Sequence, residues 1–149
     1  MPPIAANEKL EHTRKLIYSN RYMEILLGTL AYVIVTFPLA VLWHMKIFRE
    51  KYMSWQYFGE DVKPALGFAS MLVQGVVLSY GYSVLSVDHK ALLTGICYAL
   101  AMGAFLWSAH VLATMGKSSK VRHLEFFAME TVYLAIQFII YGIAISYIF

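Results

Sequence analysis

The chain has 149 residues, of which 60% are hydrophobic and only 14% are charged. Soluble domains contain about 45–50% apolar and about 25% charged residues, so this composition excludes an ordinary soluble domain. The formal charge of +3 comes from basic residues that flank apolar runs, as membrane anchors do, and not from one basic patch, which excludes a nucleic-acid partner.

Residues 1–21 form a polar segment ahead of the first apolar run. This segment lacks the apolar core and cleavage site of a secretory signal, so we expect the first membrane span itself to direct insertion. Two alternatives stay open for it. It is either a frayed tail or a short amphipathic helix that lies on the membrane surface.

Four apolar runs occupy most of the remaining chain, at residues 22–47, 64–85, 91–115 and 126–149. Each exceeds the ~20 residues that an α-helix needs to cross a hydrocarbon core of ~30 Å. Backbone groups inside lipid must bond to one another, and a helix satisfies them within a single segment. The sequence therefore predicts an all-α, polytopic membrane protein. Its four transmembrane helices form one antiparallel bundle, which is a single domain over residues 22–149.

The first span contains two features that need a reason. Glu24 lies three residues after Arg21 on the same helix face, and we expect the two to pair; the alternative is that Glu24 carries protons. Pro38 removes a backbone hydrogen bond and should bend the helix. The connection that follows, residues 48–63, is rich in Trp and Tyr, which is typical of the membrane interface.

Small residues recur at every fourth position of the second and third spans. Lipid supplies no hydrophobic drive for helices to associate, so close contact between small residues matters more. Because a short turn at residues 86–90 joins the two spans, we expect them to form an intimate antiparallel pair. Cys97, the only cysteine, excludes an intrachain disulfide and is expected to be buried. The predicted packing residues are Gly75, Ser79 and Ser83 in the second span and Ala91, Gly95, Ala99 and Gly103 in the third.

Ionisable side chains inside the spans mark a candidate site, because each costs ~2.5 kcal/mol or more to insert. His44, His110 and Glu130 come from three different spans and lie about one turn inside the same membrane surface. His123 lies in the connection just above them. Two histidines and a carboxylate can hold zinc, iron or copper, and two opposed histidines can hold haem. The competing interpretation is a hydrogen-bonded interfacial set, since no close ligand spacing such as HExxH is present.

Two amides lie deeper in the bundle. Gln74 in the second span and Gln137 in the fourth are at nearly the same depth, so we expect them to hydrogen-bond across the bundle. The chain has no phosphate-binding glycine loop, no nucleophile elbow and no cysteine cluster. The sequence therefore does not indicate an enzyme.

The stretch AVLWHMKIFREKYMSW at residues 40–55, followed by Lys63 and Pro64 at the start of a span, resembles a small bacterial family of four-span membrane proteins. That family is described only as a domain of unknown function. The aromatic pattern of the fourth span is similar as well, whereas His44 stands where the family tends to carry an aromatic residue. The resemblance implies the four-span fold and a bacterial inner membrane, and it implies no activity.

Three functions are compatible with these features. The leading hypothesis is a non-catalytic accessory subunit, packed with other membrane subunits or with further copies of itself in the lipid bilayer. The second is a redox protein that binds haem or a transition metal through His44, His110 and Glu130. The third is a small proton-coupled transporter with Glu24 or Glu130 as the proton carrier, lined by the two glutamines. With only four spans, such a transporter would have to act as an oligomer.

Overall fold

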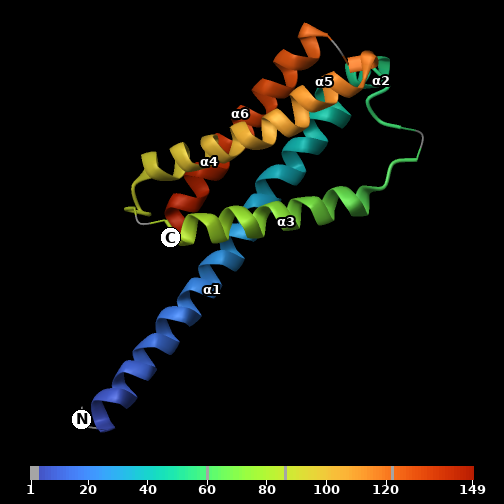
Figure 1. Cartoon of the computed structure of the whole chain (residues 1–149). Helices are drawn as coiled ribbons and strands as arrows, with labels where there is room; N and C mark the ends of the chain where they lie inside the picture. The colour runs from blue at the N-terminus through green and yellow to red at the C-terminus, as the bar shows by residue number, and fades with distance from the viewer. Residues whose placement is uncertain (1–3, 60, 86, 122) are drawn as a thin grey trace.

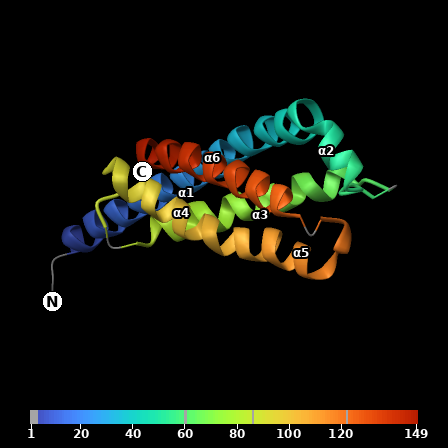
Figure 2. The ribbon, with the colours of Figure 1, turned by 90° about the horizontal axis from the view of Figure 1, so that it is seen from above.

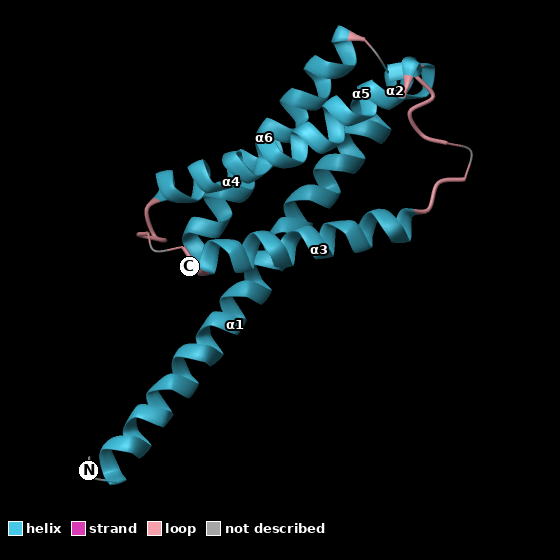
Figure 3. Cartoon of the chain, in the orientation of Figure 1, coloured by secondary structure: helices cyan, strands magenta, loops and turns pink. Residues whose placement is uncertain are grey.

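The protein is a bundle of antiparallel helices (Figure 1). The computed structural model describes residues 4–59, 61–85, 87–121 and 123–149, with side chains from residue 19 onward, and these ranges contain helices and loops but no strand (Figure 3). In chain order the elements are α1 (Ile4–Ala40), the π-helical segment η1 (Val41–Ile47), α2 (Arg49–Ser54), α3 (Pro64–Ser83), α4 (Leu92–Trp107), the π-helical segment η2 (Ser108–Leu112), α5 (Ala113–Lys117), the 3₁₀ turn η3 (Ser119–Val121) and α6 (Leu124–Ile148).

Four helical stretches are long and apolar enough to cross a membrane. The first and third continue through their π-helical segments, so each is formed by more than one element. The predicted all-α membrane bundle is confirmed, and the chain is a multi-pass integral membrane protein. The stretches are Ser19–Ile47, Pro64–Ser83, Leu92–Lys117 and Leu124–Ile148.

The first helix begins well before its membrane-spanning part. α1 starts at Ile4 and runs without a break into the first span, and Figure 1 shows its N-terminal half projecting beyond the other helices. No Pro or Gly occurs between residues 4 and 27, so nothing in the sequence interrupts the helix. Its position relative to a membrane surface stays a prediction, and residues 1–3 lie outside the described residues.

The helices pair differently from the sequence prediction. α3 packs mainly along α1, and α4 mainly along α6, so the predicted intimate pair of α3 and α4 is wrong. The small residues explain the difference, because each stripe faces another partner. A Cβ atom at Gly75 would lie 3.1 Å from the carbonyl oxygen of Thr29 in α1, and one at Gly95 would overlap the carbonyl oxygen of Gly142 in α6. Of the predicted packing residues, Gly75, Ser79, Ser83, Gly95, Ala99 and Gly103 are buried and Ala91 is partly exposed.

The two helix pairs repeat each other in sequence at an interval of 67 residues. Residues 73–82 read VQGVVLSYGY, and residues 140–149 read IYGIAISYIF. The two segments share the glycine, the serine and the tyrosine in register, and most of the remaining positions differ only among aliphatic or aromatic residues. The matched pairs include Gly28 with Gly95, Gly75 with Gly142 and Ser79 with Ser146.

The same interval relates their contacts. A Cβ atom at Gly28 would meet Ser79, and a Cβ atom at Gly95 would meet Ser146. The two π-helical segments also begin 67 residues apart, at Val41 and Ser108. Figures 1 and 2 show that the short helices after them, α2 and α5, lie at the same end of the bundle. The chain is therefore built from two similar helical hairpins, each a long helix with a π-helical end and a returning helix.

The interior of the bundle is unusually rich in tyrosine, while aliphatic side chains cover much of the outside. Cys97, predicted to be buried, is exposed. It lies two residues after Gly95, which turns it away from the seam with α6 and toward the surroundings of the bundle. The largest fully buried side chains are Tyr32, Tyr52, Tyr82, Tyr141, Phe126 and Phe138.

Candidate functional site

One carboxylate lies completely buried below the end of the bundle that carries α2 and α5. The side chain of Glu130 in α6 is 0% exposed. Five residues earlier on the same helix, Glu125 is half exposed and forms an ion pair with Lys51, with 2.7 Å between Oε1 and Nζ. Five residues of α-helix rise by roughly 7.5 Å, so Glu130 lies well below this surface pair.

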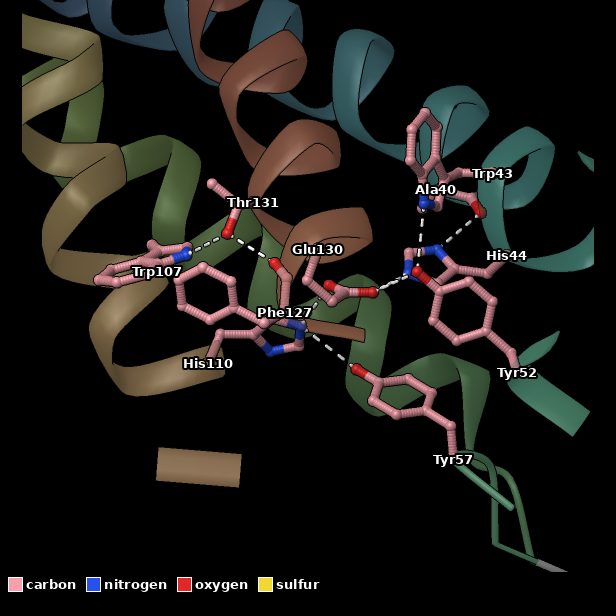
Figure 4. Close-up of polar contacts among 10 residues, drawn as sticks. All are labelled: Ala40, Trp43, His44, Tyr52, Tyr57, Trp107, His110, Phe127, Glu130 and Thr131. Carbon is pink, nitrogen blue, oxygen red and sulfur yellow. Dashed lines mark hydrogen bonds and ion pairs between the residues drawn. The ribbon is translucent and has the colours of Figure 1, made fainter. Parts of the chain in front are cut away.

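Three hydrogen-bond donors hold the Glu130 carboxylate (Figure 4). The Tyr52 hydroxyl donates to Oε1 at 2.5 Å, and His44 Nε2 lies 3.1 Å from the same oxygen. His110 Nε2 lies 3.0 Å from Oε2. Both oxygens are therefore satisfied, which a buried carboxylate requires. The donors come from three elements, since Tyr52 is in α2, His44 in η1 and His110 in η2.

Both histidines lie in π-helical segments. Such segments are rare, and they are frequent at functional sites because the extra residue rotates the side chains that follow. Pro38 lies three residues before η1 begins and lacks the N–H that an α-helix would use, which loosens the ladder at this point. The departure from α-helix in η1 and η2 is thus located where the two histidines face Glu130.

The hydrogen bonds of His44 determine how many protons the cluster holds. His44 Nδ1 lies 3.0 Å from the carbonyl oxygen of Ala40, which only accepts, so Nδ1 carries a hydrogen. The Tyr52 hydroxyl accepts from Trp43 Nε1 at 3.1 Å and gives its own hydrogen to Glu130. Between His44 Nε2 and Glu130 Oε1 there is consequently one shared proton. The pair is neutral overall whether the proton sits on the imidazole or on the carboxyl group.

The two tyrosines of the first connection remain neutral donors. Burial raises the pKa of the Tyr52 hydroxyl far above its usual range, and the hydrogen bond to Glu130 raises it further. Burial also raises the pKa of Tyr57, and the charge of Glu130 adds to this. The Tyr57 oxygen lies 3.2 Å from His110 Nε2, which already gives its hydrogen to Glu130. Tyr57 can therefore only accept there, and its own hydrogen is available to another group.

The structure brings three of the four predicted metal-ligand candidates together. His44, His110 and Glu130 meet, whereas His123 is exposed and stacks on Trp55 with 6.4 Å between ring centroids. The described residues contain no group of three or more His, Cys, Asp or Glu side chains that could hold a metal ion. The two Nε2 atoms bind different oxygens of one carboxylate, which occupies the space that a haem iron between them would need.

The two deep glutamines are linked through a tyrosine that the sequence analysis missed. The Tyr32 hydroxyl donates to Gln74 Oε1 at 2.6 Å, and Gln137 Nε2 donates to the Tyr32 oxygen at 2.9 Å. The predicted direct bond between the amides is therefore replaced by a bridge. At the other end of the first span, Glu24 is half buried and forms no ion pair with Arg21 in the part of the chain that the structure describes.

Two cavities adjoin the cluster on different sides. A cavity of about 420 Å³ lies beside His44, His110 and Tyr57 and extends between α1 and α3. A second cavity, of about 240 Å³, lies beside His110 and reaches Gln74 and Gln137. Because His110 lines both, it stands between a cavity at the α2 end and one that leads toward the middle of the bundle.

Tyr52 and Tyr57 were placed by the sequence analysis at the membrane interface, together with the rest of their connection. In the structure Tyr52 is 0% exposed and Trp55 only 7%. Between them and Tyr57 the chain turns at Gln56, which has a positive φ of 49°. This turn lets Trp55 and Tyr57 both point into the bundle. Aromatic content alone does not distinguish such a cap from an interfacial belt.

No protein-family model matches this chain, and no curated protein or solved structure matches it. Membership of a bacterial four-span family stays a prediction from the sequence.

Proposed function

We propose that the protein is a small proton-coupled membrane transporter in which the pair of Glu130 and His44 carries the proton. The observation that supports this most is the fully buried Glu130 carboxylate, which shares one proton with His44 while Tyr52 and His110 hold it in place. A packed helix end does not need an ionisable group at this depth, and its insertion is costly. Such groups are typical of proton relays in pumps and transporters.

The position of the cluster between the two hairpins also favours transport. His44 belongs to the first hairpin, whereas His110 and Glu130 belong to the second. Many transporters are built from internal repeats and bind substrate and coupling ion where the repeats meet. This is an analogy of architecture, and it gains weight here because both hairpins contribute a histidine from a π-helical segment.

The two cavities provide access from two directions. The larger one adjoins His44 and His110 at the α2 end. The smaller one runs from His110 to the bridge formed by Gln74, Tyr32 and Gln137, and it could hold several water molecules at roughly 30 Å³ each. A coupling site needs two such routes, so that the proton can arrive from one side and leave by the other.

The other hypotheses find less support. The exposed apolar side chains are those that any spanning helix presents to lipid, so they do not favour an accessory subunit. The redox hypothesis is not favoured because both histidines use Nε2 on the carboxylate. From the accessory hypothesis we keep self-association, since four spans enclose only a narrow path. We also propose a bacterial inner membrane as its location, in keeping with the bacterial family that residues 40–55 resemble.

Proteoliposomes with a pH-sensitive dye inside test this proposal. Under an imposed pH gradient, the protein is supplied in turn with an organic cation, an organic anion and a neutral polar solute. We expect one class to move protons in the wild-type protein and Glu130→Gln to abolish the movement, because an amide of the same size cannot exchange a proton. Glu125→Gln is the matched control on the same helix, since that carboxylate is half exposed.

Two results would contradict the proposal. The first is the absence of proton movement with all three classes of solute. The second is movement that persists unchanged in Glu130→Gln. A melting curve of each variant in the same detergent shows whether a loss of flux reflects a loss of folded protein.

A further inference from the structure

The larger cavity has an aromatic wall. Its lining includes five aromatic side chains and two methionines, drawn from α1, η1, α3, α6 and the first connection. The faces of aromatic rings carry negative potential and attract cations, and the sulfur of methionine is polarisable. The volume of about 420 Å³ lies within the range of pockets that bind small organic molecules. The aromatic residues are Phe37, Tyr57, Phe58, Phe68 and Tyr133.

The surroundings of this cavity favour a positively charged ligand over a negatively charged one. No Lys, Arg, Asp or Glu is among the described residues that line it, and its two histidines both direct Nε2 at Glu130. An ionised acid placed here would therefore find no free positive partner. A cation would face aromatic rings, and the Glu130 carboxylate lies only one imidazole ring away, behind His44.

The outer wall of the cavity opens toward lipid. Phe37 of α1 and Phe68 of α3 meet edge to face, with 6.4 Å between ring centroids. They are 49% and 44% exposed, so these two rings form a boundary between the cavity and the surroundings of the bundle. A molecule that dissolves in the membrane could reach the cavity here without passing α2 or the connection that follows it.

We propose that this cavity binds a lipophilic organic cation in exchange for the proton that His44 and Glu130 share. The proposal rests on the proposed function and names its substrate class. When the cation enters, the proton shared by His44 Nε2 and Glu130 leaves to water, and His44 is left as a neutral imidazole with Nδ1–H bonded to Ala40. Glu130 remains a carboxylate, and the cation takes over the balancing charge. One proton leaves for each cation, no covalent bond to carbon changes, and the net charge of the site is preserved.

The groups that face this proton come from every element around it. They are Tyr52 from α2, Tyr57 from the first connection, His110 from η2 and Tyr133 from α6. Tyr52 and Tyr57 are neutral donors, as their burial requires. His110 keeps its bond to Oε2 in both states, so the exchange concerns a single proton.

Two probes of nearly the same shape and opposite charge test the proposal. Tetraphenylphosphonium and tetraphenylborate are titrated into the wild-type protein in lipid nanodiscs between pH 6 and pH 9, with empty nanodiscs of the same lipid as the blank. We expect the phosphonium to bind and the borate to bind at least about tenfold more weakly. If binding displaces the proton that His44 and Glu130 share, the affinity for the phosphonium should rise with pH, by up to about tenfold per pH unit, as the release of one proton requires.

Two substitutions localise the binding. Phe68→Ala removes one aromatic wall and should weaken phosphonium binding by about five- to tenfold, since a cation–aromatic contact of this kind contributes about 1 kcal/mol or more. Phe105→Ala is the matched control, because Phe105 is 68% exposed and lines neither cavity. Both side chains are exposed enough that their removal should leave the fold intact.

Each outcome supports or overturns a stated part of the proposal. Stronger binding of the borate, or phosphonium binding that does not change with pH, would overturn the exchange of a cation for a proton. If the phosphonium fails to bind while the organic anion or the neutral solute moves protons in proteoliposomes, the substrate class is wrong and the proton-coupled function stands. If no solute moves protons, the proposed function itself fails.

Discussion

The two hairpins are alike at one end and different at the other. At the end that carries the C-terminus, Gly28 faces Ser79 in the first hairpin as Gly95 faces Ser146 in the second. At the opposite end, the residue 67 positions before Glu130 is Lys63, which is exposed and pairs with Asp61. Helices in lipid depend on close packing of small residues, so the shared end maintains the fold. The buried Glu130 and its hydrogen-bond donors lie where the hairpins diverge.

This divergence has a structural cause. α6 begins at Leu124, whose counterpart in the first hairpin is Tyr57, a residue of the connection. The first hairpin thus has loop where the second has two additional helical turns. Those turns carry Glu130, and the freed loop folds back and places Tyr52 and Tyr57 beside it. A site of this kind needs the asymmetry, because one hairpin supplies the carboxylate and the other its cap.

The largest expected difference between the hairpins concerns Glu130 and Lys63. Glu130→Ala leaves the buried Tyr52 and the mostly buried His44 without their acceptor, whereas the His110 side chain is 41% exposed, and losing one partner of such a buried set costs about 3–5 kcal/mol. Lys63→Ala removes an exposed ion pair and should change the free energy of unfolding by less than about 0.5 kcal/mol. Unfolding in mixed detergent micelles measures both. Similar effects of the two substitutions would remove the distinction between the ends.

Much of this comparison was within reach of the sequence. The four spans follow from length and hydropathy, and the shared depth of His44, His110 and Glu130 follows from counting residues from the ends of the spans. The repeat was also visible, as GVVLSY and GIAISY at an interval of 67 residues. This repeat predicts that the first span pairs with the second and the third with the fourth, as the structure has them. The short turn between the second and third spans predicts helix pairing less well than the repeat does.

The rest depends on details that composition does not encode. Pro38 loosens the helix just before η1, but nothing in the sequence marks η2 or the π-helical geometry itself, which results from a balance between local hydrogen bonds and the packing of His44 and His110 against Glu130. The inward turn of Tyr52 and Tyr57 depends on the backbone at Gln56. Tyr32 could be assigned to the bridge between the glutamines only once the rotation of α1 was known.

At the end where the two hairpins are alike, replacing different glycines by alanine should lower the free energy of unfolding by different amounts. A Cβ atom at Gly142 would lie 2.7 Å from Cα of Ile96, which is backbone and cannot move aside. At Gly75 the nearest atoms of Thr29 are 3.1 Å away, and at Gly28 the nearest atom is the Ser79 hydroxyl, which can rotate. We expect Gly142→Ala to cost about 2–3 kcal/mol and the first-hairpin variants less than about 1 kcal/mol.

Gly67→Ala is the control for this series. Nothing lies within 4 Å of a Cβ atom there, and alanine favours a helix over glycine by up to about 1 kcal/mol. Thermal unfolding in one detergent ranks the four variants. Equal losses at Gly142 and Gly75 would mean that the two seams are equally tight, contrary to the geometry.

The two tryptophans differ in whether their hydrogen bond leads to Glu130. Trp43 Nε1 donates to the Tyr52 hydroxyl at 3.1 Å, and Trp107 Nε1 donates to Thr131 Oγ1 at 2.9 Å. Replacing either by Phe removes one hydrogen bond and should cost about 1 kcal/mol of stability. Only Trp43→Phe should also shift the infrared band of the Glu130 carboxyl group, because its bond continues through Tyr52 to that carboxylate. A shift in Trp107→Phe of the same size would contradict this assignment.

The smallest expected effect appears at alkaline pH and concerns Tyr57, whose counterpart Leu124 is 81% exposed. Burial, together with the charge of Glu130, raises the pKa of Tyr57 above its ordinary value of 10.0. Below pH 10 both the folded and the unfolded chain keep this proton, so stability does not depend on it. Above pH 10 the unfolded chain ionises first and is stabilised, and the free energy of unfolding falls by up to about 0.8 kcal/mol at pH 10.5.

Tyr57→Phe should therefore lose less stability between pH 9 and pH 10.5 than the wild type, whereas Leu124→Ala should follow the wild-type slope. Equal slopes in all three proteins would mean that Tyr57 is not buried in the folded protein, because burial is the main cause of its raised pKa.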